Sequence, residues 1–255
     1  KDIPRGHSEP ELQDIEDVPE LQKFHFEWSK VKEIVKKPSL IFMYLQGFFG
    51  VFPWNTIVAF IFLYLSEERG YSDTQVLLTM VPTILILSLG YPIGGMLGDY
   101  FFSKTNKGRV YIAMLGVILG AVFLYFALNV PLENMTLFAI LLCITAFFIP
   151  VASPNVTSIV TDVTLPEMRS TATAIQYFIE SSGAALAPLM TGIISDHFRA
   201  AGNPTPRGTA ILIICTVAWL LCAIFFFITS KYIDKDVQSL RAAMQARATE
   251  ITHKK

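Results

Sequence analysis

Six stretches of this sequence are long and apolar enough to cross a lipid bilayer. Between Lys37 and Glu67, for example, and again between Arg207 and Lys231, no Asp, Glu, Lys or Arg occurs. A helix rises about 1.5 Å per residue and needs roughly 20 apolar residues to cross the hydrocarbon core. Five charge-free stretches and one with a single acid predict transmembrane helices over 39–65, 75–98, 110–130, 136–161, 170–195 and 208–230. The predicted fold class is therefore an all-α membrane protein, with a six-helix bundle over 39–231.

The basic residues fall almost entirely on one side of this predicted membrane. Six spans place both ends of the chain on the same side. Of the 20 Lys and Arg residues, all but Arg69, Arg199 and Arg207 lie on that side. Cytoplasmic segments of membrane proteins carry an excess of Lys and Arg. We therefore expect an integral multi-pass protein of the cell membrane, plasma or inner, with both termini cytoplasmic.

The segments outside the spans are polar. Residues 1–25 are acidic and contain proline, which predicts a flexible cytoplasmic linker. In 26–38, apolar residues at steps of three and four alternate with lysines, which predicts an amphipathic juxtamembrane helix at the lipid headgroups. Residues 232–255 are mixed in charge with a thin apolar stripe, and we expect a solvated cytoplasmic tail. The chain does not begin with Met, so we expect a piece of a longer protein.

Two predicted spans combine helix breakers with polar residues. The first contains "QGFFGVFPWNT" and the fourth contains "FFIPVASPNVTS". A proline frees backbone carbonyls, and these are tolerated where other protein groups or a water-filled cavity satisfy them. We predict that both spans line a cavity, with ordinary packing kinks as the alternative. The polar residues closest to the breaks are Asn55, Thr56, Ser153, Asn155 and Thr157.

Glu180 is a carboxylate inside the fifth predicted span. It lies 11 residues after Arg169, or about 16 Å along a helix, near the midplane where secondary transporters bind substrate. A charge at this depth is expensive and marks a functional site by default. Three roles remain open: a proton-coupling carboxyl, a ligand for a cationic or hydroxylated substrate, and a structural acid that is protonated. The predicted neighbours of a bound substrate are Gln176, Tyr177, Trp54 and Asn55.

Two turns between the predicted spans carry motifs. "GGMLGDYFFSKTNKGRV" contains Asp99 and Arg109, and "TDVTLPEMRSTATAI" contains Asp162 and Arg169. They resemble the turns between the eighth and ninth helices, and between the tenth and eleventh helices, of the major facilitator superfamily. Tyr100 departs from the pattern, because the family often has a basic residue there. The resemblance implies that the six spans are the C-terminal half of that fold.

Four charged residues of these turns are predicted to form a cytoplasmic gate. Asp99 can accept hydrogen bonds from a helix start, and Arg109 or Arg169 can pair with Asp162 where water is scarce. Such contacts hold helix ends together in one conformation and break in the other. We expect this gate of Asp99, Arg109, Asp162 and Arg169 to stabilise the outward-open state.

The implied function is secondary transport. The first residues, "DIPRGHSEPEL", resemble the linker of Spinster-type superfamily members, which move lysophospholipids and related amphiphiles. The resemblances imply rocker-switch alternating access for a small organic or amphipathic solute, with a lysophospholipid-like solute and proton coupling as specific candidates. A polar metabolite, organic anion or drug is an alternative substrate, and a non-transporting scaffold or receptor is an alternative class.

The expected partners are an N-terminal six-helix half, membrane lipid and a small-molecule substrate, with no nucleic acid, cofactor or metal. All four histidines lie outside the predicted spans, and no phosphate-binding G-x-x-x-x-G-K-[ST] loop occurs, which argues against an enzyme. The three cysteines lie in apolar spans without metal-ligand spacing.

Overall fold

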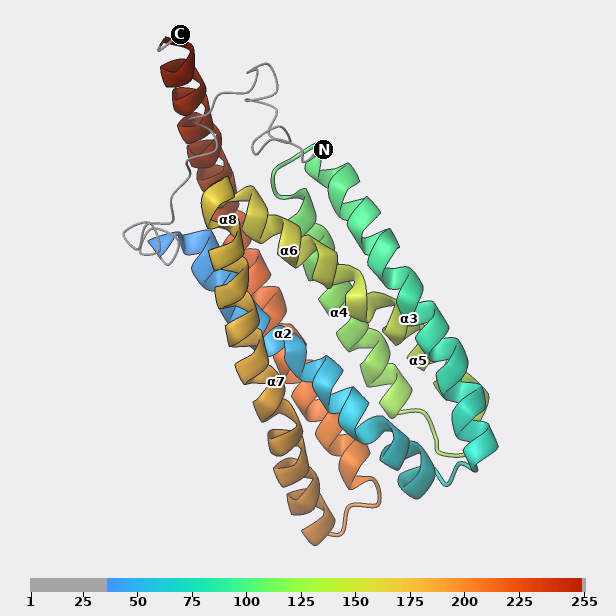
Figure 1. Cartoon of the computed structure of the whole chain (residues 1–255). Coiled ribbons are helices and arrows are strands. Elements are labelled where there is room, and N and C mark those ends of the chain that lie inside the picture. The colour runs from blue at the N-terminus through green and yellow to red at the C-terminus, as the bar shows by residue number, and fades with distance from the viewer. Residues whose placement is uncertain (1–35, 254–255) are drawn as a thin grey trace, which may run out of the picture.

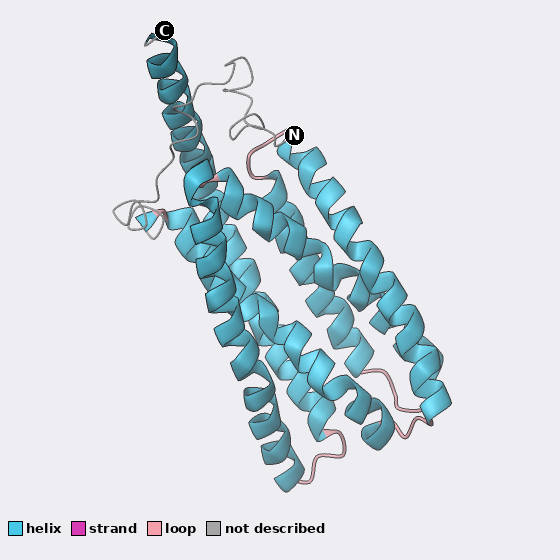
Figure 2. Cartoon of the chain, in the orientation of Figure 1, coloured by secondary structure: helices cyan, strands magenta, loops and turns pink. Residues whose placement is uncertain are grey.

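Six long helices run alternately up and down in the computed structural model, which describes residues 36–253 (Figure 1). In chain order the helical elements are α2 (Pro38–Leu63), η3 (Tyr64–Glu68), α3 (Asp73–Phe102), α4 (Gly108–Leu128), α5 (Met135–Phe148), η4 (Ile149–Val151), α6 (Ala152–Asp162), η5 (Pro166–Met168), α7 (Arg169–Ala200) and α8 (Pro206–His253). Short loops connect these helices, and the described residues contain no strand (Figure 2).

Within residues 36–253, six helices have the length and hydropathy to cross a membrane. The predicted all-α, six-helix membrane fold is thus confirmed. The helices extend beyond the charge-free stretches, since a helix can continue after its surface becomes polar. The linker over 1–25 and nearly all of the amphipathic helix over 26–38 lie outside the described residues.

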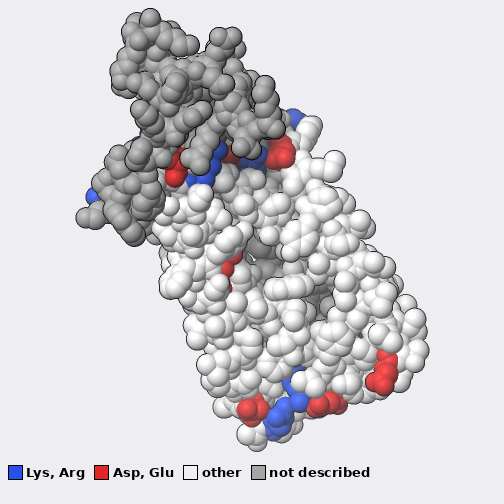
Figure 3. Space-filling model, in the orientation of Figure 1, with Lys and Arg blue, Asp and Glu red and all other residues white. Residues whose placement is uncertain are grey.

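The bundle is arranged around α2, α4 and α8. Helix α2 packs against α7 and α8, α4 packs against α8 and α5, and α3 packs against α5. The start of α2 and the extension of α8 lie at the same end of the bundle, which we call the terminal end (Figure 1). Figure 3 shows charged residues gathered at both ends, with a broad uncharged band between them that a small acidic patch interrupts beside a hollow.

The last helix does not end where its apolar span ends. Helix α8 continues without a break to His253 and buries the apolar stripe of Val237, Leu240 and Met244. The predicted tail is therefore helical, with its apolar stripe buried and residues such as Arg241 exposed. Asp236 helps to hold the extension of α8 against the start of α2. Its Oδ2 accepts hydrogen bonds from the backbone N–H of Ser39 at 3.2 Å and from the Ser39 hydroxyl at 2.5 Å. The extension of α8 thereby caps the start of α2, where backbone N–H groups have no partner within the helix.

Polar contacts also fasten the opposite end of the bundle. Glu68 accepts hydrogen bonds from the backbone N–H groups of Arg207, at 2.8 Å, and Gly208, at 3.0 Å, and so caps the start of α8. Arg69 is buried, and it donates to the carbonyl of Pro131 at 2.9 Å while its guanidinium lies 4.1 Å from the centre of the Phe138 ring. These contacts tie the end of η3 to α8 and to the loop before α5.

Candidate functional site

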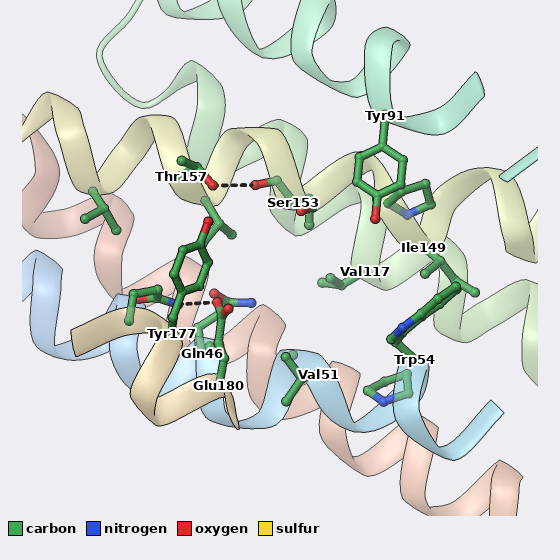
Figure 4. Close-up of a pocket in the computed structure, with 18 of the residues that line it drawn as sticks. Gln46, Val51, Trp54, Tyr91, Val117, Ile149, Ser153, Thr157, Tyr177 and Glu180 are labelled. Carbon is green, nitrogen blue, oxygen red and sulfur yellow. Dashed lines mark hydrogen bonds between the residues drawn. The ribbon is translucent and has the colours of Figure 1, made fainter. Parts of the chain in front are cut away.

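A cavity of about 230 Å³ lies between α2, α6 and α7. Helices α3, α4 and α8 each contribute to its wall (Figure 4). Its lining combines apolar side chains with amide, hydroxyl and aromatic groups and one carboxylate. The polar and aromatic lining residues are Gln46, Trp54, Tyr91, Ser153, Thr157, Thr173, Gln176, Tyr177, Glu180 and Trp219.

The helix breaks identified in the sequence border this cavity. Pro53 lies inside the continuous helix α2, and Pro150 lies in the short 3₁₀ turn η4 between α5 and α6. Both prolines are among the lining residues. Gly94 of α3 lets this turn approach, because a Cβ there would lie 2.7 Å from the carbonyl oxygen of Val151. Small residues of this kind permit close packing of membrane helices.

A compact polar cluster forms one side of the cavity. Nε2 of Gln176 donates a 2.6 Å hydrogen bond to Oε1 of Glu180, one turn further along α7. Gly47 of α2 faces this pair: a Cβ at Gly47 would overlap Nε2 of Gln176 and would lie 3.3 Å from Cγ of Glu180. The absence of a side chain at Gly47 therefore makes room for both polar groups between α2 and α7.

Gln46 completes this cluster from α2. A Cβ at Gly50 would lie only 2.6 Å from Nε2 of Gln46, so Gly50 makes room for this amide in the same way. Gln46 and Gln176 are 4% and 3% exposed, and the Oε1 atom of each is buried without a hydrogen-bond partner. Figure 4 shows the side chains of Gln46 and Glu180 close to one another at the cavity wall.

Exposed side chains form another part of the cavity wall. Trp54, Tyr91 and Tyr177 are each about half exposed, at 44%, 48% and 56%. Ser153 and Thr157 on α6 are exposed too, and the hydroxyl of Thr157 donates to the carbonyl of Ser153 at 3.4 Å. The cavity therefore has a buried polar side and an open aromatic and hydroxyl side.

Trp219 closes the cavity on the α8 side. It is 3% exposed, and its ring lies 3.6 Å from the position of a Cβ at Gly120. The same ring also lines an apolar groove of about 270 Å³ between α4 and α8. Trp219 thus contributes to the walls of both spaces.

The structure brings together most of the residues predicted for the binding site. Five of them line the cavity: Glu180, Gln176, Tyr177, Trp54 and Ser153. The other two, Asn55 and Asn155, do not. The amide of Asn55 donates to the carbonyl of Val51, one turn earlier in its own helix, at 2.8 Å. Asn155 is buried and donates to the carbonyls of Gly94, at 2.9 Å, and Val151, at 2.8 Å, so it joins α6 to α3.

Of the polar and aromatic lining residues, Gln46, Tyr91 and Trp219 were not predicted from the sequence. Gln46 carries a signal that could have been used, because it is an amide in a charge-free span directly before Gly47. Tyr91 and Trp219 carry none, since aromatic residues are common throughout these helices. Among the described residues, no group of three or more His, Cys, Asp and Glu side chains could hold a metal.

The predicted gate residues meet at the terminal end of the bundle. Arg109, at the start of α4, binds two acids at once. Its Nη2 lies 2.7 Å from Oδ1 of Asp99 near the end of α3, and its Nη1 pairs with Asp162 at the end of α6. Arg169 donates from Nε to the carbonyl of Thr161 at 3.3 Å, one residue before Asp162. These contacts connect the ends of α3, α4, α6 and α7.

The sequence profile of the Major Facilitator Superfamily matches residues 5–188 and 48–250 in two overlapping alignments. The chain belongs to the Major Facilitator Superfamily. This superfamily chain is similar to the hexuronate transporter of Bacillus subtilis strain 168, with 26% identity over 160 residues that make up 58% of this chain and 37% of that protein.

A solved relative shows the same fold. It is a bacterial homologue of the human lysosomal transporter Spinster, in an inward-facing and unoccupied conformation, with a TM-score of 0.70 and 18% identity. The match covers 88% of this chain and 53% of the solved chain. The chain therefore spans about half the length of this relative and 37% of the curated one, and its six helices correspond to a half of the superfamily fold.

Proposed function

We propose that this chain is the C-terminal half of a secondary transporter and that its solute binds between this half and an N-terminal six-helix half. The observation that supports this most directly is the cavity with Glu180 in its wall. Glu180 is 11 residues from the start of α7, which is about 16 Å along the helix. Transporters bind their substrates at such a depth, where two bundles meet.

In this proposal the two bundles rock about the solute, and the contacts of Arg109 act as a gate. With both termini on the cytoplasmic side, the ion pairs of Arg109 lie at the cytoplasmic ends of the helices. Their formation closes that side and stabilises the outward-open state, and their rupture opens it. Exposed aromatic residues such as Trp54 and Tyr177 face the second half and the solute.

The relatives suggest two kinds of solute. One relative is a hexuronate transporter, and the other is a homologue of Spinster. We propose a small organic or amphipathic solute, with a lysophospholipid-like amphiphile as one candidate and a polar metabolite, organic anion or drug as the other. Glu180 serves as a ligand for the solute or as the carboxyl that couples transport to protons.

Flux into sealed vesicles tests this proposal. The full-length protein would be reconstituted with a proton-sensitive dye inside, and uptake of labelled glucuronate and labelled lysophosphatidylcholine would be measured under an imposed pH gradient. We expect uptake of one probe above that of empty vesicles, reduced at least about tenfold by Glu180→Gln. Gly192→Ala is the matched control on α7, because a Cβ there has no neighbour closer than 3.9 Å.

The dye separates the two roles of Glu180. Uptake that acidifies the vesicles and loses this acidification in Glu180→Gln would support proton coupling. If neither probe enters and Glu180→Gln behaves like the unchanged protein, secondary transport of these solutes is wrong. Binding without flux would instead favour a receptor or scaffold.

A further inference from the structure

The buried side of the cavity contains two amide oxygens without a hydrogen-bond partner and one carboxylate. We propose that this half recognises hydrogen-bond donors of its ligand, ammonium or hydroxyl groups, and excludes acidic groups. This inference rests on the proposed function and specifies the substrate class for the same cavity.

Two amide oxygens carry the argument. Oε1 of Gln46 and Oε1 of Gln176 are buried without a hydrogen-bond partner, and both side chains are more than nine-tenths buried at the cavity wall. Buried polar atoms in native structures nearly always have a partner, and an exception requires an explanation. A ligand that donates hydrogen bonds to both oxygens, after a movement of these side chains that opens them to the cavity, would supply this explanation.

Glu180 fixes the orientation of one amide. Nε2 of Gln176 lies 2.6 Å from Oε1 of Glu180. Rotating the amide by half a turn would place the carbonyl oxygen of Gln176 against the carboxylate and lose this hydrogen bond. When Glu180 is ionised, the unpaired atom of Gln176 is therefore the acceptor. A carboxylate can accept several hydrogen bonds, so Glu180 has capacity beyond the one from Gln176.

The lining offers no positive charge to an acidic ligand. Of the described residues in the cavity wall, none is Lys, Arg or His. A carboxylate, sulfonate or phosphate placed beside Glu180 would meet a like charge in a site of low dielectric constant. In a complete transporter, any acidic group of the solute would have to be bound by the other half.

The open side of the cavity suits the same ligand class. Trp54, Tyr91 and Tyr177 present partly exposed rings at the cavity. Aromatic faces attract ammonium groups, most strongly where water is excluded. The apolar face of a hydroxylated ring can pack against the same surfaces.

Chemical modification of an introduced cysteine tests this without knowledge of the natural solute. Ser153→Cys would be placed in the full-length protein and treated with three methanethiosulfonates that differ only in the ethyl substituent: 2-aminoethyl, 2-hydroxyethyl and 2-sulfonatoethyl. Each rate would be divided by the rate of the same reagent with 2-mercaptoethanol. The protein without this substitution is the control, since its Cys215 and Cys222 are fully buried and Cys143 is partly buried.

We expect the normalised rates to fall in the order aminoethyl, hydroxyethyl, sulfonatoethyl. The first should exceed the last at least about tenfold, because a cleft of one charge sign enriches the opposite sign by this factor or more. Adding Glu180→Gln should bring this ratio close to one. Equal normalised rates, a faster sulfonate, or a ratio that Glu180→Gln leaves unchanged would overturn the proposal.

A cysteine at a second position is needed in case Ser153→Cys does not react. Thr157 is exposed on the same helix and also lines the cavity. If neither Ser153→Cys nor Thr157→Cys reacts with any reagent, the cavity admits no polar solute and the proposal fails. The modification rates can be measured without transport. If the reagents keep the expected order but no solute enters the vesicles, the proposed transport function is wrong and the ligand class stands. If the three rates are equal but solute enters, only the ligand class is wrong.

Discussion

Arg109 at the start of α4 forms an ion pair with Asp162 at the end of α6, although the two residues are 53 positions apart in the chain. The same guanidinium binds Asp99 of α3. A planar guanidinium with several N–H donors suits such double pairing, and a lysine would not replace it equally. One side chain therefore holds three helix ends together at the terminal end of the bundle.

We expect Asp162→Asn to destabilise the protein more than Asp99→Asn. The Asp162 side chain is 20% exposed and that of Asp99 is 68% exposed, so water screens the second pair far more. The loss should be about 1 to 3 kcal/mol for Asp162 and below about 1 kcal/mol for Asp99. Thermal unfolding of the full-length protein in nanodiscs measures both values. Equal losses would show that burial does not set the strength of these pairs.

A separate measurement tests whether the ion pairs of Arg109 act as a gate. If these pairs stabilise a state closed at the terminal end, Asp162→Asn should increase the reaction of Ser153→Cys with an impermeant thiol reagent added from that side. The reaction from the opposite side should fall. Unchanged reactivity on both sides would leave the pairs with a purely structural role.

Replacing Gln46 should separate stability from function. Gln46→Met keeps the approximate shape but removes a buried acceptor that has no partner. Such an acceptor costs about 1 to 3 kcal/mol, so we expect a higher melting temperature together with slower modification of Ser153→Cys by the aminoethyl reagent. Gln176→Met is the matched comparison: it removes an unpaired oxygen of the same kind but also the hydrogen bond to Glu180, so its melting temperature should lie below that of Gln46→Met. A lower melting temperature in Gln46→Met would contradict the idea that this oxygen is unsatisfied.

Two glycines of α7 should respond oppositely to alanine. A Cβ at Gly183 would overlap the carbonyl oxygen of Phe48 and push α2 away from α7, whereas a Cβ at Gly192 meets only Phe60 at 3.9 Å. We expect Gly183→Ala to cost about 1 to 3 kcal/mol, and Gly192→Ala to be neutral or stabilising by up to about 1 kcal/mol, since alanine favours helices. Melting temperatures of the two variants provide the comparison. Similar values would mean that α2 and α7 do not pack this closely.

The extension of α8 should contribute to stability through Asp236. Asp236→Ala removes the acceptor of two hydrogen bonds at the start of α2 and should cost about 0.5 to 2 kcal/mol, as for other helix caps. Asp234→Ala is the neighbouring control. Its ion pair with Lys107 at 3.1 Å is partly exposed on both sides, so its loss should change stability less than the loss of Asp236. Unfolding at low and high salt checks this, because only the Asp234 effect should depend strongly on salt.

The sequence by itself determined the number and position of the membrane helices. A bilayer imposes a minimum apolar length and a high cost on charges, and both can be counted along the chain. The same cost singled out Glu180, because a carboxylate in an apolar span requires a special environment. Asp99, Arg109 and Asp162 were grouped because the two turns that carry them resemble turns of the superfamily and lie on the same predicted side of the membrane.

Only the tertiary structure decided which polar side chains share the cavity. Asn155 and Ser153 are two positions apart beside Pro154, yet Asn155 is buried against Gly94 and Ser153 faces the cavity. Which one lines the cavity depends on the rotation of α6 after its break, and this rotation is set by packing against α3. Gln46 joined the site because Gly47 lets α2 approach α7 and Gly50 leaves room for the Gln46 amide. Such contacts join residues far apart in the chain, and helix periodicity describes only one helix at a time.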